Sequence, residues 1–471
     1  MRIVPAGDAR FLFLGDVIPE SIGPEGDEPF SPERLADVAA GGDESLYAFL
    51  DTLAGRFAVI LVEEERARVF HDPMGARTIL YSTRRPLAVA SHAMLLGDCL
   101  GAAPDEDIRR HRAEPGFGDR STRSLPGDRT IFEGIRALMP NNLLDSRTMD
   151  MHRYWPRAAR AESSLATFEQ RLDISLGSLA RYVSGRYQPV FGATGGADSR
   201  LAMTGFRAFG VPFETVTWGL PALKPREQEI IGALVARTDA PHTNLVTVVD
   251  KTPLDGIAYR NSGGYRRPYS STRDMLAVFG ARRDAVFLKG HGAEIIRGFY
   301  NIRSRGLSTL EPAGIAGLYF AAGRGRAPAE TVAMFKGYHR RVGYEGLDSL
   351  GFDPNDIHYW EHRMGTWSAG VANELDVAIR SIPTFNSRPL FAAALGLPPR
   401  ERLTKRLFLR QTARLDPALG DLPIDKMSAA RYLDSEAAGR QSRRSPPRGA
   451  LSALRKKVAR YARKIARMLD A

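Results

Sequence analysis

The residues best suited to chemistry lie in a short turn, Thr194-Gly195-Gly196-Ala197-Asp198-Ser199. Apolar residues 190–193 precede it and predict a strand that is buried on both faces, as in a parallel sheet. Helical periodicity follows and ends at Gly210, an expected C-cap, while Asp198 or Ser199 can cap the start. The two glycines open the backbone N–H groups to a ligand, with the positive end of the helix dipole behind them. The turn therefore predicts a phosphate site.

The glycine spacing excludes both the lysine-bearing phosphate loop and the six-residue dinucleotide fingerprint. The order Thr-Gly-Gly-x-Asp-Ser instead resembles the Ser-Gly-Gly-x-Asp-Ser loop of the N-type ATP pyrophosphatases, which break ATP into AMP and pyrophosphate. Thr194 replaces the usual serine and keeps its hydroxyl. The resemblance implies that ATP is bound by Thr194, Gly195, Gly196, Asp198 and Ser199. The alternative is an ordinary strand, turn and helix with a polar cap.

The segments that follow must position this turn. Strands are expected at 213–218, 242–249 and 285–289, with a helix at 226–237 between the first two. Strands separated by helices indicate a parallel sheet, with ligands at the carboxyl ends of its strands. By the same resemblance, adenine is expected near Thr217 to Gly219, at the end of the second strand.

A second motif, Lys289 to Tyr300, follows the last of these strands. It resembles the asparagine synthetase segment Ser-Gly-x-Gly-Ala-Asp-Glu-x-x-x-Gly-Tyr, with Gly292 on a family glycine and Glu294 on the first acid. The resemblance implies that Asp198 and Glu294 hold Mg²⁺ against pyrophosphate oxygens, because this hard cation prefers oxygen ligands. The alternative for Glu294 is a surface carboxylate that caps a helix. His291 has no second ligand at metal spacing, so it is interpreted as a structural or substrate-contact residue and not as a metal ligand.

Residues 422–426 resemble the closing segment of the same family, where a lysine steadies the transition state. This resemblance makes Lys426 a candidate catalytic residue, alongside Glu294. The alternative is a solvated loop lysine.

Residues 1–157 contain mostly strand-like segments, with a hairpin expected around Glu63-Glu64-Glu65. In their order they resemble the glutaminase-like lobe of the asparagine synthetases. That lobe uses a cysteine at position 2, where this chain has Arg2. Cys99 is internal, cannot supply the α-amine that acts as base, and is expected to be a small buried residue. We therefore expect no glutamine hydrolysis.

Composition sets wider limits. The 471 residues are 43% hydrophobic and 25% charged, as in globular proteins of two or three domains. There is no apolar run of membrane-spanning length, no signal-peptide pattern and a single cysteine, so a cytoplasmic protein without disulfides is expected.

The basic charge belongs to the end of the chain. Residues 440–471 hold 11 Lys and Arg and one acid, and so carry +10 of the net +12. Apolar residues at helical spacing from Leu451 to Met468 predict a basic amphipathic helix. It fits an anionic membrane surface, an acidic partner or its own protein body. The phosphate backbone of a nucleic acid offers no apolar surface for the apolar face of this helix, so nucleic acid is disfavoured as its partner.

Together these features predict an α/β protein with three regions. An N-terminal α+β sandwich lobe like the Ntn hydrolases covers 1–157. A parallel-sheet synthetase domain of the adenine-nucleotide α-hydrolase (PP-loop) type, with a helical C-terminal part, covers 165–430, and the basic tail covers 440–471.

The resemblance implies an AMP- and pyrophosphate-forming carbon–nitrogen ligase of the asparagine synthase type, which uses ATP and Mg²⁺. Like the β-lactam synthetases and lasso-peptide cyclases of the same family, it is expected to use ammonia or a substrate amine, with a small-molecule or peptide carboxylate as acyl donor. One alternative is a family member with weakened catalysis that binds a membrane or partner, with a cytoplasmic or peripheral membrane location. A less favoured alternative is an RNA-modifying enzyme.

Overall fold

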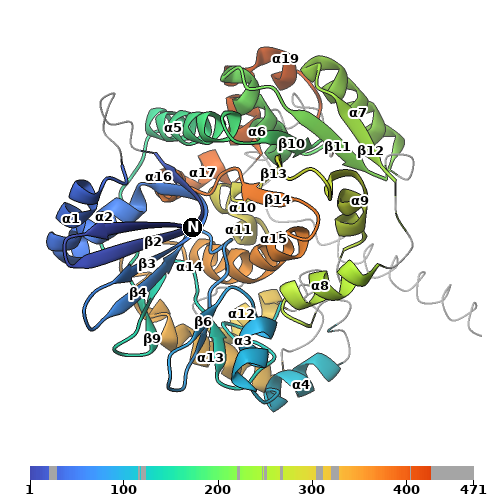
Figure 1. Ribbon diagram of the computed structural model, residues 1–471. Helices are drawn as coiled ribbons and strands as arrows, with labels where there is room; N and C mark the ends of the chain where they lie inside the picture. The colour runs from blue at the N-terminus through green and yellow to red at the C-terminus, as the bar shows by residue number, and fades with distance from the viewer. Residues whose placement is uncertain are drawn as a thin grey trace, which may run out of the picture. The chain divides into compact units, whose positions relative to one another are not determined.

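The structure, a computed structural model, describes residues 1–20, 29–114, 117, 124–219, 223–246, 248, 252–265, 269–303, 311–319, 328–403 and 405–425 (Figure 1). All of them belong to one compact unit, Met1–Asp425. Lys426 and the basic tail at 440–471 lie outside the described residues, so the expectations about them stay predictions. The domain boundaries expected at 157, 165 and 430 also stay predictions.

The N-terminal region is built on an antiparallel sheet of six strands in the order β1-β2-β3-β4-β8-β9. The strands are β1 (Arg2–Ala6), β2 (Ala9–Pro19), β3 (Leu53–Val62), β4 (Ala67–His71), β8 (Asn142–Asp145) and β9 (Asp150–Arg153). The expected hairpin at Glu63-Glu64-Glu65 is confirmed, since it joins β3 to β4 and the Glu63 amide donates to the Arg66 carbonyl at 2.8 Å. This region also holds helices α1 (Pro32–Ala40), α2 (Gly42–Asp51), α3 (Ala93–Leu100) and α4 (Glu106–Ala113). A small sheet holds β6 (Val89–Ala90), β5 (Leu80–Ser82) and β7 (Ile135–Ala137).

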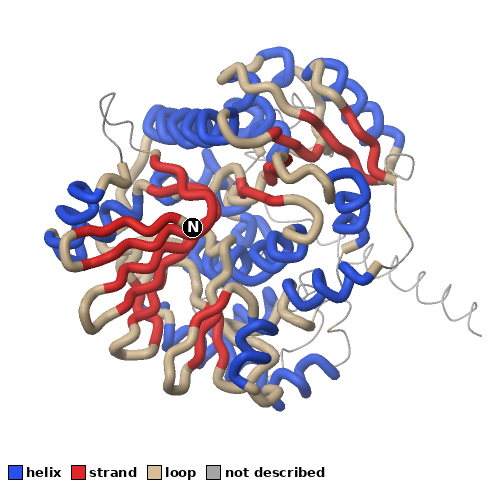
Figure 2. Tube along the Cα trace, in the orientation of Figure 1, coloured by secondary structure: helices blue, strands red, loops and turns tan. Residues whose placement is uncertain are grey.

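The second large sheet is parallel, with the strand order β12-β11-β10-β13-β14. Its strands are β12 (His242–Leu245), β11 (Glu214–Trp218), β10 (Gln188–Gly192), β13 (Ala285–Lys289) and β14 (Arg380–Pro383). Figure 2 shows the two sheets as separate groups of strands. The expected α/β class, with strands and helices alternating from β10 onward, is confirmed.

Helices cover the parallel sheet, and its central strands β10 and β13 are largely buried. One face buries Val190, Val216 and Phe287 against α9 and α15, through Met275 and Leu375. Along α5, buried apolar residues recur every three or four positions, and this face packs on α6, α16 and β10. The helices near the sheet are α5 (Leu165–Ser184), α6 (Ala197–Ala208), α7 (Pro225–Thr238), α8 (Pro253–Asn261), α9 (Ser270–Phe279), α15 (Ala369–Leu375) and α16 (Arg388–Gly396).

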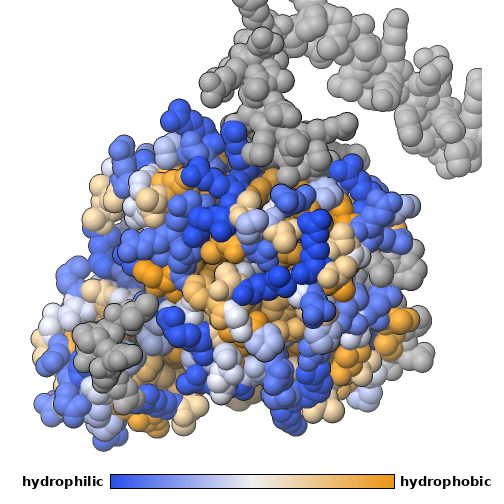
Figure 3. Space-filling model, turned by 90° about the horizontal axis from the view of Figure 1, so that it is seen from above, coloured by the Kyte–Doolittle hydropathy of each residue, from blue (hydrophilic) through white to orange (hydrophobic). Residues whose placement is uncertain are grey.

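The remaining described helices have 3 to 13 residues. They are α10 (Ala293–Ile296), α11 (Phe299–Arg303), α12 (Pro312–Tyr319), α13 (Ala329–Arg341), the 3₁₀ turn η2 (Tyr344–Gly346), α14 (Pro354–His358), the π-helical η3 (Tyr359–Ser368), α17 (Pro399–Arg402), α18 (Arg406–Leu415) and α19 (Pro417–Gly420). None of the described helices is long and apolar enough to cross a bilayer. On the face seen in Figure 3, hydrophobic residues form small patches among hydrophilic ones.

Buried polar contacts join the antiparallel sheet to the helices of the second region. Arg56 of β3 makes a bidentate ion pair with Asp376, at 2.6 and 2.7 Å. Arg153 of β9 pairs in the same way with Glu361 of η3, at 2.6 and 2.9 Å, and the Glu361 side chain is fully buried. The Trp360 indole donates to the Pro73 carbonyl at 2.6 Å. These contacts fix η3 against the N-terminal sheet.

We expect the Glu361→Ala variant to be strongly destabilised, because it leaves the Arg153 guanidinium buried without its counter-charge. Breaking a buried ion pair in this way costs about 3–5 kcal/mol. Asp173→Ala is the control, since its partner Arg414 is 32% exposed and the pair lies at the surface; its expected cost is below about 1 kcal/mol. The midpoints of urea denaturation compare the two. Equal midpoints would contradict the role given to the Arg153–Glu361 pair.

Candidate active site at the switch point of the parallel sheet

The strand order reverses at β10, which places the candidate site. The chain runs from β10 outward to β11 and β12, and then returns to β13 on the other side of β10. Ligands of such sheets bind where neighbouring strands lead off in opposite directions, at their carboxyl ends. The loops that follow β10 and β13 carry the two sequence motifs, at 194–199 and 289–300.

The turn after β10 forms the expected strand, loop and helix, with one correction at each end. Gly196 is the N-cap of α6, without a side-chain bond, so the expectation that Asp198 or Ser199 caps this helix is wrong. Both lie in the first turn instead, which leaves their side chains available to a ligand. At the other end the C-cap is Phe209, and Gly210 follows it with φ +67°, in a Schellman motif closed by the Val211 amide and the Phe206 carbonyl at 3.0 Å.

Two hydroxyls line the turn. The Thr194 and Ser199 Oγ atoms are 2.6 Å apart, and the Gly196 amide donates to the Thr194 hydroxyl at 3.2 Å. Thr217 is buried, and its hydroxyl donates to the Ala193 carbonyl at 2.9 Å. Thr217 therefore supports the start of the turn from β11, and its hydroxyl proton is used within the protein.

The glycines of the motifs permit close packing. A Cβ on Gly195 would lie 2.9 Å from the Cβ of Asp425, whose amide donates to the Gly195 carbonyl. A Cβ on Gly290 would lie 3.2 Å from the backbone between Asp198 and Ser199. Gly292 has φ +95°, and a Cβ there would lie 3.0 Å from Phe385. The loop after β13 is thereby held against the first turn of α6. Gly219, with φ +58°, has open space around it.

This packing brings the two acids of the motifs together with an arginine. Arg297 donates from Nη2 to Asp198 Oδ2 at 3.0 Å. Asp198 Oδ1 and Glu294 Oε2 are both shielded from solvent and have no hydrogen-bond partner among the residues that the structure describes. Burial of its carboxylate, with the nearby charge of Asp198, raises the pKa of Glu294 to about 7. The alternative interpretation of Glu294 as a surface carboxylate is therefore wrong.

The donor set fits a hard divalent cation. Among the described residues, one oxygen of each carboxylate has no hydrogen-bond partner, and a cation could bind there. The described residues hold no group of three or more acids, histidines or cysteines placed for a metal. A magnesium ion here would take Asp198 and Glu294 as protein ligands and complete its shell with phosphate oxygens and water, as this ion commonly does.

A cavity of about 280 Å³ adjoins the turn. Its walls are mainly aromatic and aliphatic, and the Trp218 indole nitrogen is buried in the protein without a partner. The cavity is lined by Gly192, Thr194, Ser199, Trp218, Tyr269, Ser271, Thr272, Phe287, Leu288, Lys289, Gly290, His291, Val371 and Leu375. It can hold a flat apolar group, such as a nucleobase, next to the phosphate turn.

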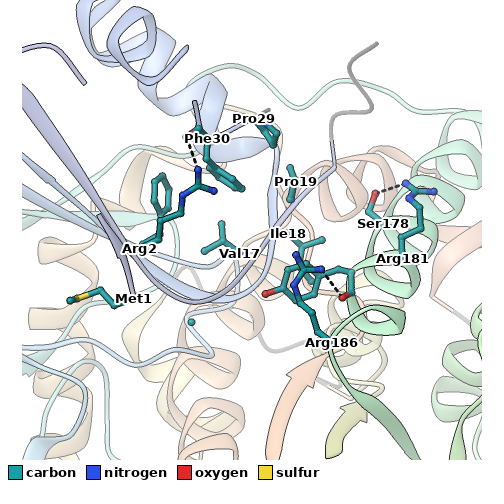
Figure 4. A pocket seen from close by; sticks show the side chains of 13 residues that line it. Met1, Arg2, Val17, Ile18, Pro19, Pro29, Phe30, Ser178, Arg181 and Arg186 are labelled. Atoms are coloured by element: carbon teal, nitrogen blue, oxygen red, sulfur yellow. Dashed lines mark hydrogen bonds between the residues drawn. The ribbon is translucent and has the colours of Figure 1, made fainter. Parts of the chain in front are cut away.

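A larger cavity, about 580 Å³, lies between β2 and α5 (Figure 4). Its lining includes Arg2, Arg181 and Arg186 and the hydroxyl-bearing Ser178 and Tyr182, but no carboxylate, thiol or imidazole. Arg2 donates to the Phe30 carbonyl at 3.2 Å. We take the smaller cavity as the candidate site because it adjoins the two sequence motifs.

Several residues depart from what the sequence indicated. Cys99 is exposed on α3, so the expectation of a buried cysteine is wrong. Arg297 was not predicted as a site residue. Its position three residues after Glu294, a spacing that places two helical residues on one face, could have indicated it. Trp218 falls inside the range Thr217 to Gly219 that was expected near adenine, although it was not named individually. Lys426 lies outside the described residues.

We expect Asp198→Ala and Glu294→Gln each to weaken cation binding at least about 10-fold, because each removes the negative charge of one proposed ligand. Mn²⁺ serves as the probe, with its affinity measured by calorimetry on the full chain. Asp173→Ala, on the exposed pair, is the control and should bind Mn²⁺ as the unaltered protein does. Unchanged affinity in both site variants would show that the two acids do not bind a metal.

No protein-family model matches this chain, and no curated protein matches it. Among solved structures, the NMN synthetase from Francisella tularensis matches with 13% identity over 45% of this chain and 96% of its own, at a TM-score of 0.23. A glutamine phosphoribosylpyrophosphate amidotransferase from B. subtilis, in complex with ADP and GMP, matches with 13% identity over 64% of this chain and 59% of its own, at a TM-score of 0.20. Such low scores carry no argument about fold or activity, so the conclusions below rest on the chain's own residues and geometry.

Proposed function

We propose that this protein is an ATP-dependent ligase that forms an amide bond and releases AMP and pyrophosphate. The observation that carries the proposal is the meeting of two motifs at one point of the sheet. The Thr-Gly-Gly-Ala-Asp-Ser turn lies against a loop whose Glu294 adds a second carboxylate with an unpartnered oxygen. Both motifs resemble the corresponding segments of the asparagine synthetase family, and that family's chemistry needs both at one site.

Each part of the site has a role in this reaction. The hydroxyls of Thr194 and Ser199 and the amides of the turn would bind the terminal phosphates of ATP. The cavity beside Trp218 would hold the adenine or the acyl substrate. Asp198 and Glu294 would hold Mg²⁺, which when bound offsets charge on the departing pyrophosphate. We include Lys426 as a further cation for that charge.

The reaction has two steps. A carboxylate oxygen of the acyl substrate attacks the α-phosphorus, and the bond from that phosphorus to the bridging oxygen breaks, which releases pyrophosphate. The amine nitrogen then attacks the acyl carbon of the adenylate, AMP leaves, and the amine loses a proton. His291 lines the cavity, and its pKa is lowered well below the ordinary value by burial and by Lys289 and Arg363, so its imidazole is neutral. Its Nδ1 lies 2.6 Å from the Ser368 hydroxyl.

A nucleotide-binding protein without turnover is the second candidate. The ion pair between Arg297 and Asp198 favours it, because this pair occupies an oxygen that a metal would otherwise use. The two candidates differ in their products.

We expect the protein, incubated with Mg²⁺, ATP labelled at the α-phosphate, and a panel of carboxylic acids with ammonia or amines, to yield labelled AMP and free pyrophosphate. Asp198→Ala should abolish the products and keep the fold, as judged by circular dichroism. Formation of ADP and phosphate would contradict the ligase proposal. Tight ATP binding with no product across the panel would support the second candidate.

We expect no release of ammonia from glutamine, and no change in ligase activity for the Cys99→Ala variant. The reason is that the α-nitrogen of Cys99 is part of a peptide bond, because this residue lies in the middle of the sequence, on α3, and so cannot act as a base. Ammonia release is followed by a coupled assay, with glutamine or ammonium chloride as the nitrogen source. A glutamine-dependent activity that disappears in Cys99→Ala would overturn this expectation.

A further inference from the structure

The larger cavity has walls of two kinds (Figure 4). Its volume, about 580 Å³, lies in the range of sites for small organic molecules. On the side of β2 the described wall is mainly apolar and includes Phe13, Ile18 and Phe30, with the rings of the two phenylalanines 5.0 Å apart. On the side of α5 it carries Arg181, in the last turn of the helix, and Arg186, just after it. A ligand here therefore meets an apolar surface on one side and positive charge on the other.

The two arginines have no acidic partner in the part of the chain that the structure describes. Arg181 donates to the Ser178 hydroxyl at 3.3 Å, and Arg186 donates to the Tyr182 carbonyl at 3.1 Å. Each of these bonds uses one N–H group of the five that a guanidinium carries. Both arginines are exposed, so their other donors are hydrated and can exchange water for the oxygens of an anion.

The nearest acid of β2 is bonded to other groups. Asp16 is buried and does not line the cavity. Its carboxylate accepts from the Tyr182 and Tyr187 hydroxyls at 3.1 and 2.7 Å, and Arg380 pairs with it at 3.2 Å. The negative charge of Asp16 is therefore offset by Arg380, and the two arginines of the cavity stay available to an anion that enters it.

We propose that the larger cavity binds a phosphate monoester with an apolar body. The phosphate contacts Arg181 and Arg186, and the body lies against Phe13, Ile18 and Phe30. A phosphate monoester carries about −1.5 to −2 at pH 7, which matches the two guanidinium charges. Arginine also suits phosphate because its planar fork presents parallel donors to two oxygens.

This site is separate from the proposed ligase site. Among the described residues, the two cavities share no lining residue. The inference therefore goes beyond the proposed function, and either one can fail without the other.

The test titrates the full chain with 1-naphthyl phosphate by calorimetry. A soluble aryl phosphate and a single-chain lipid phosphate share the same chemistry, so decyl phosphate is the second probe, and the tighter of the two identifies the source. Three further titrations separate the parts of the ligand: 1-naphthol lacks the phosphate, inorganic phosphate lacks the body, and AMP has a polar body.

The double variant Arg181→Gln/Arg186→Gln removes both charges from the cavity. Its control, Arg147→Gln/Arg340→Gln, makes the same change in net charge at two exposed residues that line neither cavity. We expect the cavity variant to lose at least about 10-fold in affinity for the tighter probe, because it removes charged hydrogen-bond donors. The control should stay within about two-fold of the unaltered chain.

We also expect the tighter probe to bind at least about 10-fold more strongly than 1-naphthol, inorganic phosphate or AMP, because only the probe uses both walls. Four results would overturn the proposal. They are no binding of either probe, equal affinity in the cavity variant and the unaltered chain, equal affinity for 1-naphthol and 1-naphthyl phosphate, and complete displacement of the probe by saturating Mg²⁺ and ATP. The last result would show that the probe occupies the smaller cavity.

Discussion

The site depends on two partly buried carboxylates that the fold holds near each other. Asp198 and Glu294 lie in the first turns of α6 and α10, and each has an oxygen without a hydrogen-bond partner among the described residues. Burial of Glu294 and repulsion by Asp198 raise the pKa of Glu294 to about 7, so this arrangement is stabilised by positive charge beside it. Arg297 supplies part of that charge through its bond to Asp198. Glycine at 290 permits the close approach, because a Cβ there would lie 3.2 Å from the backbone of α6.

The antiparallel sheet supports this site from a distance. Its Arg153 pairs with the buried Glu361, and the carbonyl of Pro73 accepts from Trp360, so two successive residues of η3 are fixed to the N-terminal region. Ser368, whose hydroxyl lies 2.6 Å from His291 Nδ1, follows them in the same π-helical segment. The antiparallel sheet therefore holds the segment that contacts His291 in the wall of the smaller cavity.

Local sequence signals predicted much of this. Apolar runs bounded by turn residues located β10, β11 and β13, because periodicity and turn chemistry act over a few residues. The third strand was expected at 242–249, but the described strand β12 ends at Leu245. The exact cap of α6 was missed because Gly196 and Asp198 are both acceptable there, and tertiary packing decides between them. The contact between Ser368 and His291 could not be predicted, since it joins residues 77 positions apart in the sequence.

The decisive measurement is a crystal structure of the full chain with Mg²⁺ and α,β-methylene ATP, which cannot break at the α-phosphorus. We expect the phosphates on the turn at 194–199, a cation bound to Asp198 and Glu294, and the adenine or the α-phosphate at the mouth of the cavity beside Trp218. A nucleotide bound elsewhere, for example among the arginines of the larger cavity, would contradict the proposed site. The same conclusion would follow from phosphates that contact the turn with Arg297 still bonded to Asp198 and no cation present.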